Sequence, residues 1–386
     1  MSQPESVYIT AEHLALRESV ARFLAREVEP HGQAWEEQGY VPREVLRKLG
    51  ALGMLGITYP GEYGGAGADP MTSLVFAEAL SRSTFGGFVA TVLVHTDMAS
   101  PHLVHAGSQA QLAKYLPRII RGELVSAVAM TEPDVGSDIA HLKSRARLDG
   151  DSWVLNGTKM FITNGVFADI YFVAMRTNPE VKGSRGISMF IVEKGTQGLR
   201  VGRALKKTGW LCSDTAELVF EDCRIPAENL LGRENEGFYA LMKNLQTERI
   251  AISAMAVGHC LTAMRLTLDY VSQRKAFGGA LLEKQAIRHR LAMLDAKVEA
   301  ARAFLYHCAW LATERRDCTR EVSMLKALSC ELVNEVTYTC QQFHGGMGYM
   351  RETAIERLQR DARVLPIGGG ATEVMLEEVA KRFTAA

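Results

Sequence analysis

The chain has 386 residues, of which 47% are hydrophobic and 23% are charged, as in an ordinary globular protein. Basic and acidic residues both number 44, so the formal net charge is zero. Nothing global favours binding to nucleic acid or to an anionic membrane surface, and an anionic ligand must be held by local donors. The length allows two or three domains of roughly 100–200 residues each.

Targeting and disulfide signals are absent from the pattern. The first ten residues are polar and lack the basic segment and apolar stretch of a signal peptide, and no run of 18 or more apolar residues predicts a membrane span. Seven cysteines are scattered, none in a CxxC pair. We therefore expect a cytoplasmic protein with reduced thiols and no disulfide framework.

The first third, residues 1–123, is predicted to be an α-helical domain. Apolar residues follow helical spacing from Thr10 until Pro30 closes the segment, and Pro42 opens a second helix. The stretch 59–67 contains five glycine or proline residues in nine and is predicted to be a loop. Segments 71–80 and 111–120 are again helical in pattern.

Residues 124–235 are predicted to form a β domain. The strand-like runs, with β-branched and aromatic residues, are 153–155, 160–163, 170–174, 188–192 and 216–220. The pairs Asn156-Gly157 and Asn164-Gly165 have the composition of tight turns. The pattern indicates a compact, barrel-like domain of roughly six to eight strands.

Residues 236–386 return to a helical pattern. The segment 238–272 has no proline and a single glycine, Gly258, and forms a helix of ~50 Å if unbroken. Further helices are predicted at 284–313, 320–343, 352–363 and 372–383. The fold class is therefore α+β: an N-terminal helical domain, a middle β domain and a C-terminal antiparallel four-helix bundle.

Several common site motifs are missing. The sequence has no GxxxxGK[ST] loop, no GxGxxG on a strand-to-helix turn and no HExxH. His102 and His105 are three residues apart, but no acidic or thiol partner lies near them in sequence, so no metal site is predicted. Gly136-Ser137 lacks the GxSxG frame of a nucleophile elbow.

Three segments together carry a resemblance. They are Ala-Met-Thr-Glu-Pro-Asp-Val-Gly-Ser-Asp at 129–138, Arg-Lys-Ala-Phe-Gly at 274–278 and Gln-Phe-His-Gly-Gly-Met-Gly-Tyr at 342–349, the last continued by Glu352, Arg357 and Asp361. In this order and spacing the chain resembles the FAD-dependent acyl-CoA dehydrogenase family from about residue 10 to 383. Val135 and His141 depart from it, each replacing a small residue, which we interpret as local repacking.

The resemblance implies that one group of FAD contacts lies in the β domain. A flavin that accepts hydride needs donors where negative charge develops. The family places a hydroxyl at the flavin N1/O2 edge, here Thr131, and another beside N5, here Thr163. Phe161 stands where the family often has a tryptophan over one flavin face. Met130 and Ser137 complete this group. Taken singly, a threonine or phenylalanine in such a run is more often strand packing.

A second group is implied to hold the adenosine diphosphate half of FAD, partly across a subunit interface. These residues are Arg274, Phe277, Gln285, Gln342, Gly345, Gly346, Ala371 and Glu373. An arginine fork suits pyrophosphate, although a basic residue at a helix end is also common without a ligand. If these assignments hold, the protein is at least a dimer, and the family norm is a homotetramer, a dimer of dimers.

The catalytic base is implied by two positions together. Dehydrogenation of a thioester removes a proton from Cα and a hydride from Cβ, and a buried carboxylate with a raised pKa suits the first task. Most of the family carries this carboxylate in a C-terminal loop, where this chain has Gly369; Glu373 lies four residues further. A minority, including long-chain and isovaleryl-CoA dehydrogenases, uses a Glu-Arg pair on the long helix, matched here by Glu248-Arg249. Alone, Glu248 is a surface charge, the ordinary interpretation of glutamate on a helix.

The remaining site residues follow from the same resemblance. The backbone N–H of Gly369 is expected to polarise the thioester carbonyl. Ser137, Tyr239, Arg249 and Gly370 are expected to contact the acyl-CoA, with Arg249 pairing to a buried carboxylate or carbonyl. Asp214 is expected to fix a turn of the β domain.

The closing segment is most similar to the long-chain and citronellyl-CoA dehydrogenases, so we expect a branched or medium-to-long acyl-CoA and electron-transferring flavoprotein as the acceptor. Three alternatives stay open on the sequence. They are an acyl chain on a carrier protein, an oxygen-using flavin oxidase or monooxygenase of the same fold, and a non-catalytic helical interaction protein.

Overall fold

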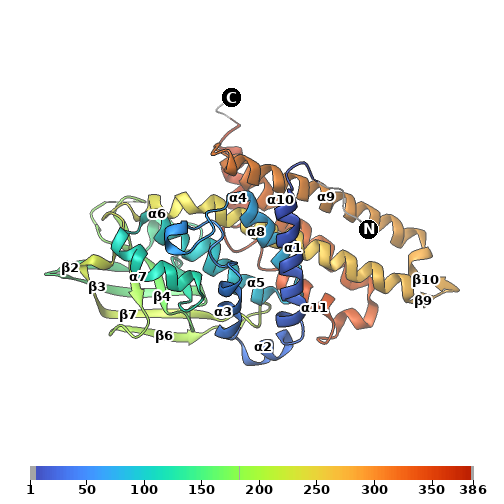
Figure 1. Ribbon diagram of the computed structural model, residues 1–386, viewed down its shortest axis with the longest axis horizontal. Coiled ribbons are helices and arrows are strands. Elements are labelled where there is room, and N and C mark those ends of the chain that lie inside the picture. The colour runs from blue at the N-terminus through green and yellow to red at the C-terminus, as the bar shows by residue number, and fades with distance from the viewer. Residues whose placement is uncertain (1–5, 182, 384–386) are drawn as a thin grey trace.

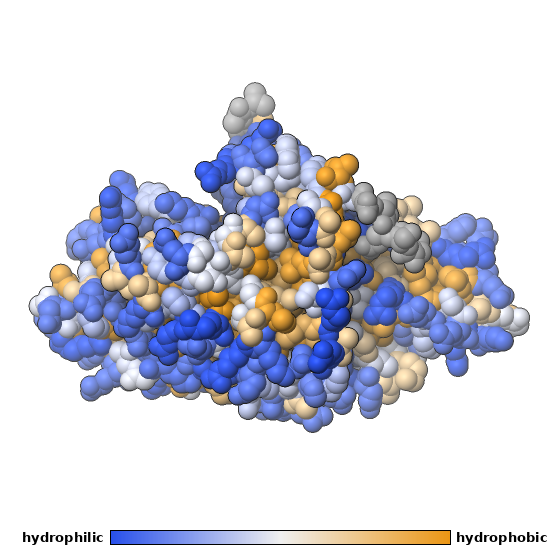
Figure 2. Space-filling model, in the orientation of Figure 1, coloured by the Kyte–Doolittle hydropathy of each residue, from blue (hydrophilic) through white to orange (hydrophobic). Residues whose placement is uncertain are grey.

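The computed structural model describes residues 6–181 and 183–383. Within them the chain is helical, then β, then helical, as the sequence predicts. In Figure 1 the sheet lies at one end of the long axis, together with α6 and α7, the long C-terminal helices extend to the other end, and α1 to α5 lie between them. On the face in Figure 2, hydrophobic residues gather near the middle and toward the end that carries strands β9 and β10.

The N-terminal region contains seven α-helices in its described part. They are α1 (Ala11–Phe23), α2 (Gly32–Gln38), α3 (Arg43–Ala51), α4 (Pro70–Leu80), α5 (Gly86–Leu93), α6 (Pro101–Ala106) and α7 (Gln109–Ile120). Two π-helical segments, Leu24–Val28 and Val94–Ala99, continue α1 and α5. The side chains of Thr10, Asp69 and Ser108 accept backbone N–H groups at the starts of α1, α4 and α7, which fixes where these helices begin.

The β domain is one eight-stranded sheet with the path β6-β7-β3-β2-β4-β5-β8, and β1 pairs with β4 in parallel. Its strands are β1 (Ser126–Ala129), β2 (Arg145–Asp149), β3 (Ser152–Thr163), β4 (Ile170–Arg176), β5 (Ile187–Glu193), β6 (Leu199–Ala204), β7 (Thr215–Pro226) and β8 (Leu230–Leu231). The end strands β6 and β8 are not paired with each other in the described residues, so this barrel-like domain is an open sheet.

One turn prediction is wrong. Asn156-Gly157 lies inside the continuous strand β3, where the pairing with β7 shifts register between Leu155 and Gly157. A β-bulge uses the same residue types as a tight turn, because an extra residue must adopt an unusual backbone conformation. The predicted turn at Asn164-Gly165 is confirmed, since β3 ends at Thr163 and Asn164 has a φ of 62°.

The C-terminal region is built on α8 (Gly237–Gln273), 37 residues long. It packs with α9 (Gln285–Thr313) and α10 (Thr319–Phe343), while α11 (Ala354–Ala362) and α12 (Thr372–Ala380) pack on α10. By length and composition α8 could cross a membrane, but 89% of its most apolar window is buried inside the protein, as in a core helix. The short hairpin β9 (Lys275–Ala276) and β10 (Gly279–Ala280) joins α8 to α9.

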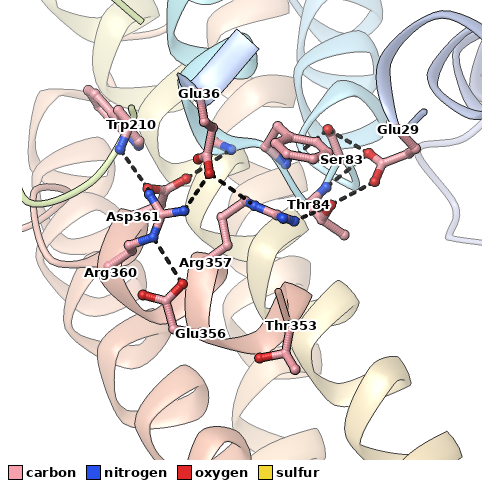
Figure 3. A network of polar contacts seen from close by, with 12 residues as sticks. Glu29, Glu36, Ser83, Thr84, Trp210, Thr353, Glu356, Arg357, Arg360 and Asp361 are labelled. Atoms are coloured by element: carbon pink, nitrogen blue, oxygen red, sulfur yellow. Dashed lines mark hydrogen bonds and ion pairs between the residues drawn. The ribbon is translucent and has the colours of Figure 1, made fainter. Parts of the chain in front are cut away.

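The three regions meet at a buried polar junction, drawn in Figure 3. Arg360 of α11 contacts Glu36 of α2 at 2.6 Å, and Asp361 accepts the backbone N–H groups of Gly86 (3.1 Å) and Trp210 (2.5 Å). One short helix therefore ties the N-terminal helices, the β domain and the bundle together. Asp361, quoted above among the resemblance motifs, has this structural role.

Candidate active site

Glu248 is buried in the middle of the fold, on α8. Only 5% of the residue is exposed. The side-chain amide of Asn244, one turn earlier, donates to Glu248 Oε1 at 3.0 Å and also to the backbone carbonyl of Asp97 at 2.8 Å. His102 Nε2 lies 3.8 Å from the same carboxylate oxygen. The carboxylate is thus not a surface charge but a buried group oriented by an amide.

Burial raises the pKa of Glu248 to about 7, opposed by the hydrogen bond from Asn244 and by the charge of Arg249, whereas Asp97 raises it further. A carboxylate acts as a general base only when ionised. A group with this pKa is about half ionised at neutral pH and is a stronger proton acceptor than an exposed carboxylate.

If Glu248 is the base, proton removal from bound acyl-CoA should accelerate as pH rises through about 7 and level off above it. We expect the rate constant of flavin bleaching, measured at saturating substrate by anaerobic stopped flow, to fall about tenfold for each pH unit below that value. A flat profile from pH 5 to 9 would assign the base to a group with an ordinary carboxylate pKa.

The loop at 368–371 lies against the same face of α8. A Cβ built on Gly369 would lie 2.1 Å from Ile252 Cδ1, and one on Gly370 would lie 4.0 Å from Arg249 Nε. Gly369 and Gly370 have φ values of +63° and +99°, which residues with side chains rarely adopt. The buried Lys326 of α10 donates to the Gly370 carbonyl and anchors the loop. The glycines therefore let the backbone approach the helix that carries Glu248.

The structure also places Glu373 and Arg249, two predicted site residues near this loop. Glu373 is exposed in the first turn of α12, away from the buried carboxylate. The expected partner of Arg249 is not found: Arg249 is buried, and no hydrogen bond to its guanidinium is formed by the described residues. Its Nε is fully enclosed without an acceptor, and burial lowers its pKa. A cation so placed next to the loop is available to a ligand carbonyl or phosphate.

The β-domain residues of the predicted flavin site lie on two segments that contact each other. The backbone N–H of Met160 donates to the carbonyl of Thr131 at 2.8 Å, which joins the 130–138 loop to β3. Phe161 has a φ of 62° at a second bulge of β3 and is 65% exposed. Thr163, at the end of β3, is half-buried. An exposed aromatic ring held in strained backbone, next to two hydroxyls, suits a planar ring system.

A buried ion pair supports this loop. Lys159 Nζ donates to Glu132 Oε1 at 2.7 Å and to the Met130 carbonyl at 3.1 Å. Glu132 also accepts the backbone N–H groups of Lys143 (2.6 Å) and Ser144 (2.9 Å). Burial lowers the pKa of Lys159 to about 8, and the Glu132 carboxylate opposes that shift. The pair thus fixes both ends of the loop that carries Thr131 and Ser137.

Lys159→Met is expected to destabilise this loop by about 3–5 kcal/mol, because it leaves the Glu132 carboxylate buried without a counter-ion. Hydrogen exchange at the amides of Lys143 and Ser144 should accelerate, and the purified protein should retain less FAD. The double variant Lys159→Met/Glu132→Gln should recover part of the loss, since no uncompensated charge remains. Equal exchange in the single variant and the wild type would contradict this role of the pair.

Apart from Ala371 and Glu373, which lie at the start of α12, the second predicted group lies at the end of the molecule opposite the β domain. Phe277 is at the turn between β9 and β10, which Figure 1 places at the far end from β2 and β3, and it is 93% exposed. Arg274, Gln285 and Gln342 are also exposed. His344 stacks on Tyr270 of α8 with ring centroids 4.4 Å apart, which brings Gly345 and Gly346 beside the end of α8. These residues therefore lie around the C-terminal end of α8, whereas Thr131 and Thr163 belong to the β domain.

The remaining predicted residues fall as follows. Tyr239 is exposed in the first turn of α8, Ser137 is exposed in its loop, and Ala371 precedes α12. Asp214 accepts the backbone N–H of Val166 at 2.6 Å, which confirms its role in a β-domain turn. Val135 is buried in a hydrophobic cluster, as expected for local repacking.

Sequence reasoning missed four polar residues around the site. They are Asn244, His102, Lys159 and Lys326. Asn244 could have been found from its spacing, because residues i and i+4 share a helix face with Glu248. The other three come from distant segments, and no local pattern indicates them.

Comparisons with known proteins agree with this geometry. Residues 10–123, 127–223 and 235–384 match the models of the N-terminal, middle and C-terminal domains of acyl-CoA dehydrogenase. The class defined by fold and site is thus a flavin-dependent dehydrogenase of helix–sheet–helix architecture. The chain belongs to the acyl-CoA dehydrogenase family and is an acyl-CoA dehydrogenase.

The relatives and solved structures are similar over nearly their whole length. Mouse long-chain specific acyl-CoA dehydrogenase is 42% identical over 97% of this chain and 87% of the relative. Isovaleryl-CoA dehydrogenase from Pongo abelii is 35% identical over 98% of this chain and 90% of the relative. The acyl-CoA dehydrogenase structure from Geobacillus kaustophilus superposes with a TM-score of 0.95 at 38% identity, covering 98% of this chain and 100% of that one.

Two other structural neighbours concern flavins. PigA with FAD and proline superposes with a TM-score of 0.94 at 27% identity, covering 98% of this chain and 99% of that chain. A chain from the structural work on the electron transferring flavoprotein of Acidaminococcus fermentans gives a TM-score of 0.95 at 34% identity, covering 99% of this chain and 100% of that chain. The family is FAD-dependent, and the exposed Phe161 with its neighbouring hydroxyls fits a flavin.

Proposed function

We propose that the protein converts a branched or medium-to-long acyl-CoA to the trans-2-enoyl-CoA, with Glu248 as the catalytic base. The observation that carries this proposal is a buried carboxylate on α8 beside a loop that has glycine at position 369. Glu248 takes the Cα proton, and the Gly369 N–H polarises the thioester carbonyl so that this proton is easier to remove. When bound, FAD supplies the acceptor for the hydride from Cβ.

The substrate preference is supported by where the base is attached. A Cβ at position 369 would lie 2.1 Å from Ile252 Cδ1, so the loop carries no side chain there and the base reaches from α8 instead. The similarity to long-chain specific and isovaleryl-CoA dehydrogenases favours a longer chain or a methyl branch. Arg249, buried and without a partner among the described residues, is proposed to contact the acyl-CoA together with Ser137, Tyr239 and Gly370.

For the cofactor, we propose that Met130, Thr131, Ser137, Phe161 and Thr163 hold the flavin ring. The diphosphate and adenosine are assigned to Arg274, Phe277, Gln285, Gln342, Gly345 and Gly346 of a partner subunit, with Ala371 and Glu373. The separation of the two groups in one chain supports this division (Figure 1). The exposed Phe277 is the kind of surface that a partner or ligand covers. A homotetramer follows from the same proposal.

Two further parts of the proposal concern the electron acceptor and the localisation of the protein. Electron-transferring flavoprotein is proposed as the oxidant, supported by the family and by the A. fermentans neighbour. Cytoplasmic localisation is proposed on the seven cysteines, all of which are free and buried.

Anaerobic titration of the yellow holoprotein with a panel of acyl thioesters tests the proposal. We expect flavin bleaching with methyl-branched and medium-to-long acyl-CoAs, and weaker bleaching with butyryl-CoA. A strong preference for butyryl-CoA would contradict the substrate assignment. Faster bleaching by the same chain on a carrier protein would transfer the activity to that thioester, and rapid peroxide release in air would indicate an oxidase.

A further inference from the structure

His102 is a buried imidazole that the proposed reaction does not use. It lies on α6 and is 1% exposed, and neither ring nitrogen has a hydrogen-bond partner among the described residues. Leaving a buried donor or acceptor unpaired costs about 1–3 kcal/mol, and native proteins rarely do so without a reason. His102 and His105 have no third metal ligand near them in sequence, and no group able to hold a metal ion is found in the described residues.

The ring points at the base. Nε2 of His102 lies 3.8 Å from Oε1 of Glu248, and α6 packs directly on α8. A hydrogen bond between these atoms requires an approach of roughly 0.8 Å, to the usual ~3.0 Å for N–H···O. Hydrogen bonds at catalytic groups are often long without substrate and shorten in the complex.

The imidazole is a neutral donor in this position. Burial lowers the pKa of His102 to about 3, and the nearby His105 lowers it further. A neutral imidazole carries one N–H, so His102 can donate to a carboxylate without adding a charge to the site. It can therefore orient Glu248 and lower the pKa of this carboxylate less than a paired cation would.

We propose that His102 is a positioning residue: its Nε2–H donates to the ionised Glu248 carboxylate and, with the Asn244 amide, holds it in the orientation that accepts the Cα proton. The inference rests on the proposed role of Glu248 as the base. Two donors on two different helices, α6 and α8, fix the carboxylate better than the single amide, because each restricts a different rotation of the side chain.

Other groups face the same carboxylate, and they determine how the contribution of His102 is measured. Asp97, in the π-helical segment before α6, raises the pKa of Glu248, and Arg249 on α8 lowers it. His105 lies one turn further along α6 and is exposed. These groups remain in place when His102 is replaced. A change in the pKa of Glu248 therefore reports the loss of the hydrogen bond from His102.

The test compares His102→Phe, which keeps a ring and removes the donor, with His102→Asn, which keeps an N–H donor, in the FAD-loaded protein. Loss of a donor to the ionised form should raise the apparent pKa of Glu248 by about one unit, since one unit corresponds to 1.36 kcal/mol. For His102→Phe we expect the bleaching rate at saturating acyl-CoA to fall about tenfold at pH 6 and to change little at pH 9. His102→Asn should recover most of the rate, and the exposed His105→Phe is the matched control that leaves it unchanged.

A second measurement is independent of turnover. Infrared difference titration without substrate follows the carboxyl band that Glu248→Gln removes, and this band should titrate about one unit higher in His102→Phe. An unchanged titration in a variant that retains FAD, or equal rates for the Phe and Asn variants, would overturn the proposal.

If His102→Phe does not fold, the ring-nitrogen resonances of His102 in the wild type should move as Glu248 ionises, and resonances that stay constant would overturn it. If the wild type bleaches with no acyl-CoA, the proposed function fails, whereas the infrared titration still tests the contact.

Discussion

Glu248→Gln should bind FAD like the wild type and lose flavin bleaching by acyl-CoA by ~10²–10⁴-fold, the usual contribution of a general base. Glutamine has the shape of glutamate and can still accept the hydrogen bond from Asn244, so the fold around α8 should be kept. What is lost is the ability to take a proton. The measurement is the rate constant of bleaching in anaerobic stopped flow, with FAD content determined from the absorbance of the same sample.

Glu377→Gln is the matched control, because Glu377 is an exposed carboxylate on α12. It should bleach like the wild type. Near-normal bleaching by Glu248→Gln would mean that the base is elsewhere, and Glu373 would be the next candidate. The structure makes that outcome unexpected, since Glu373 is exposed and lies beyond the glycine loop.

The environment of Glu248 shows why the sequence could single it out as the candidate base. The evidence was a missing side chain at Gly369 together with a Glu-Arg pair far away in the chain. The structure brings the two together through Ile252, which leaves no space for a Cβ at position 369. Neither position is informative alone, because a glycine in a loop and a glutamate on a helix both have ordinary structural explanations.

The helices that could be predicted are those with local signals. Apolar spacing predicts α4 and α7 to within one and two residues of their observed starts, which follow the capping residues Asp69 and Ser108, and the absence of proline predicts α8. The helix α5 was missed because all its residues are buried, so no polar face marks its period. Strand β3 was divided in two because the bulge at Gly157 resembles a turn.

The polar contacts could not be predicted, because each joins residues far apart in sequence. Lys159 pairs with Glu132, and Lys326 with the Gly370 carbonyl, across 27 and 44 positions. Burial of such groups is set by the packing of whole elements, and a lysine in a strand or helix is otherwise expected to be exposed. For the same reason the expected pairing of Arg249 with a buried carboxylate or carbonyl is not found: its Nε is buried without an acceptor among the described residues.

The second large effect, a loss of stability, is expected when Arg360 is replaced at the junction drawn in Figure 3. Arg360 is the cation that faces three carboxylates: its Nη2 is 2.6 Å from Glu36, its Nε is 3.1 Å from Glu356 and its Nη1 is 3.7 Å from Asp361. Burial raises the pKa of Asp361 to about 7, and Arg360 opposes that shift. Arg357 lies 3.5 Å from Glu36 and also lowers the pKa of Asp361, but less than Arg360 does.

Arg360→Leu should therefore cost about 3–5 kcal/mol at the junction, the loss expected when one partner of a buried ion pair is removed. Because the three carboxylates join α2, α11 and the segment at Trp210, the cost should appear as separation of the three regions and not as unfolding of one helix. The amide hydrogens of Gly86 and Trp210, which are bonded to Asp361, report this opening directly. We expect them to exchange on the order of 10²–10⁴-fold faster, at about 1.4 kcal/mol per factor of ten.

The control is Arg363→Leu, which removes an exposed arginine two residues after Asp361 and should leave both amides protected. Arg360→Lys should give an intermediate effect, because one ammonium cannot contact three carboxylates as the guanidinium does. If the amides of Gly86 and Trp210 exchange at wild-type rates in Arg360→Leu, the carboxylates are held by their backbone donors and not by the arginine. Loss of FAD without faster exchange would instead connect Arg360 to the cofactor site. The expected result is faster exchange first, with FAD released as the β domain separates from the bundle.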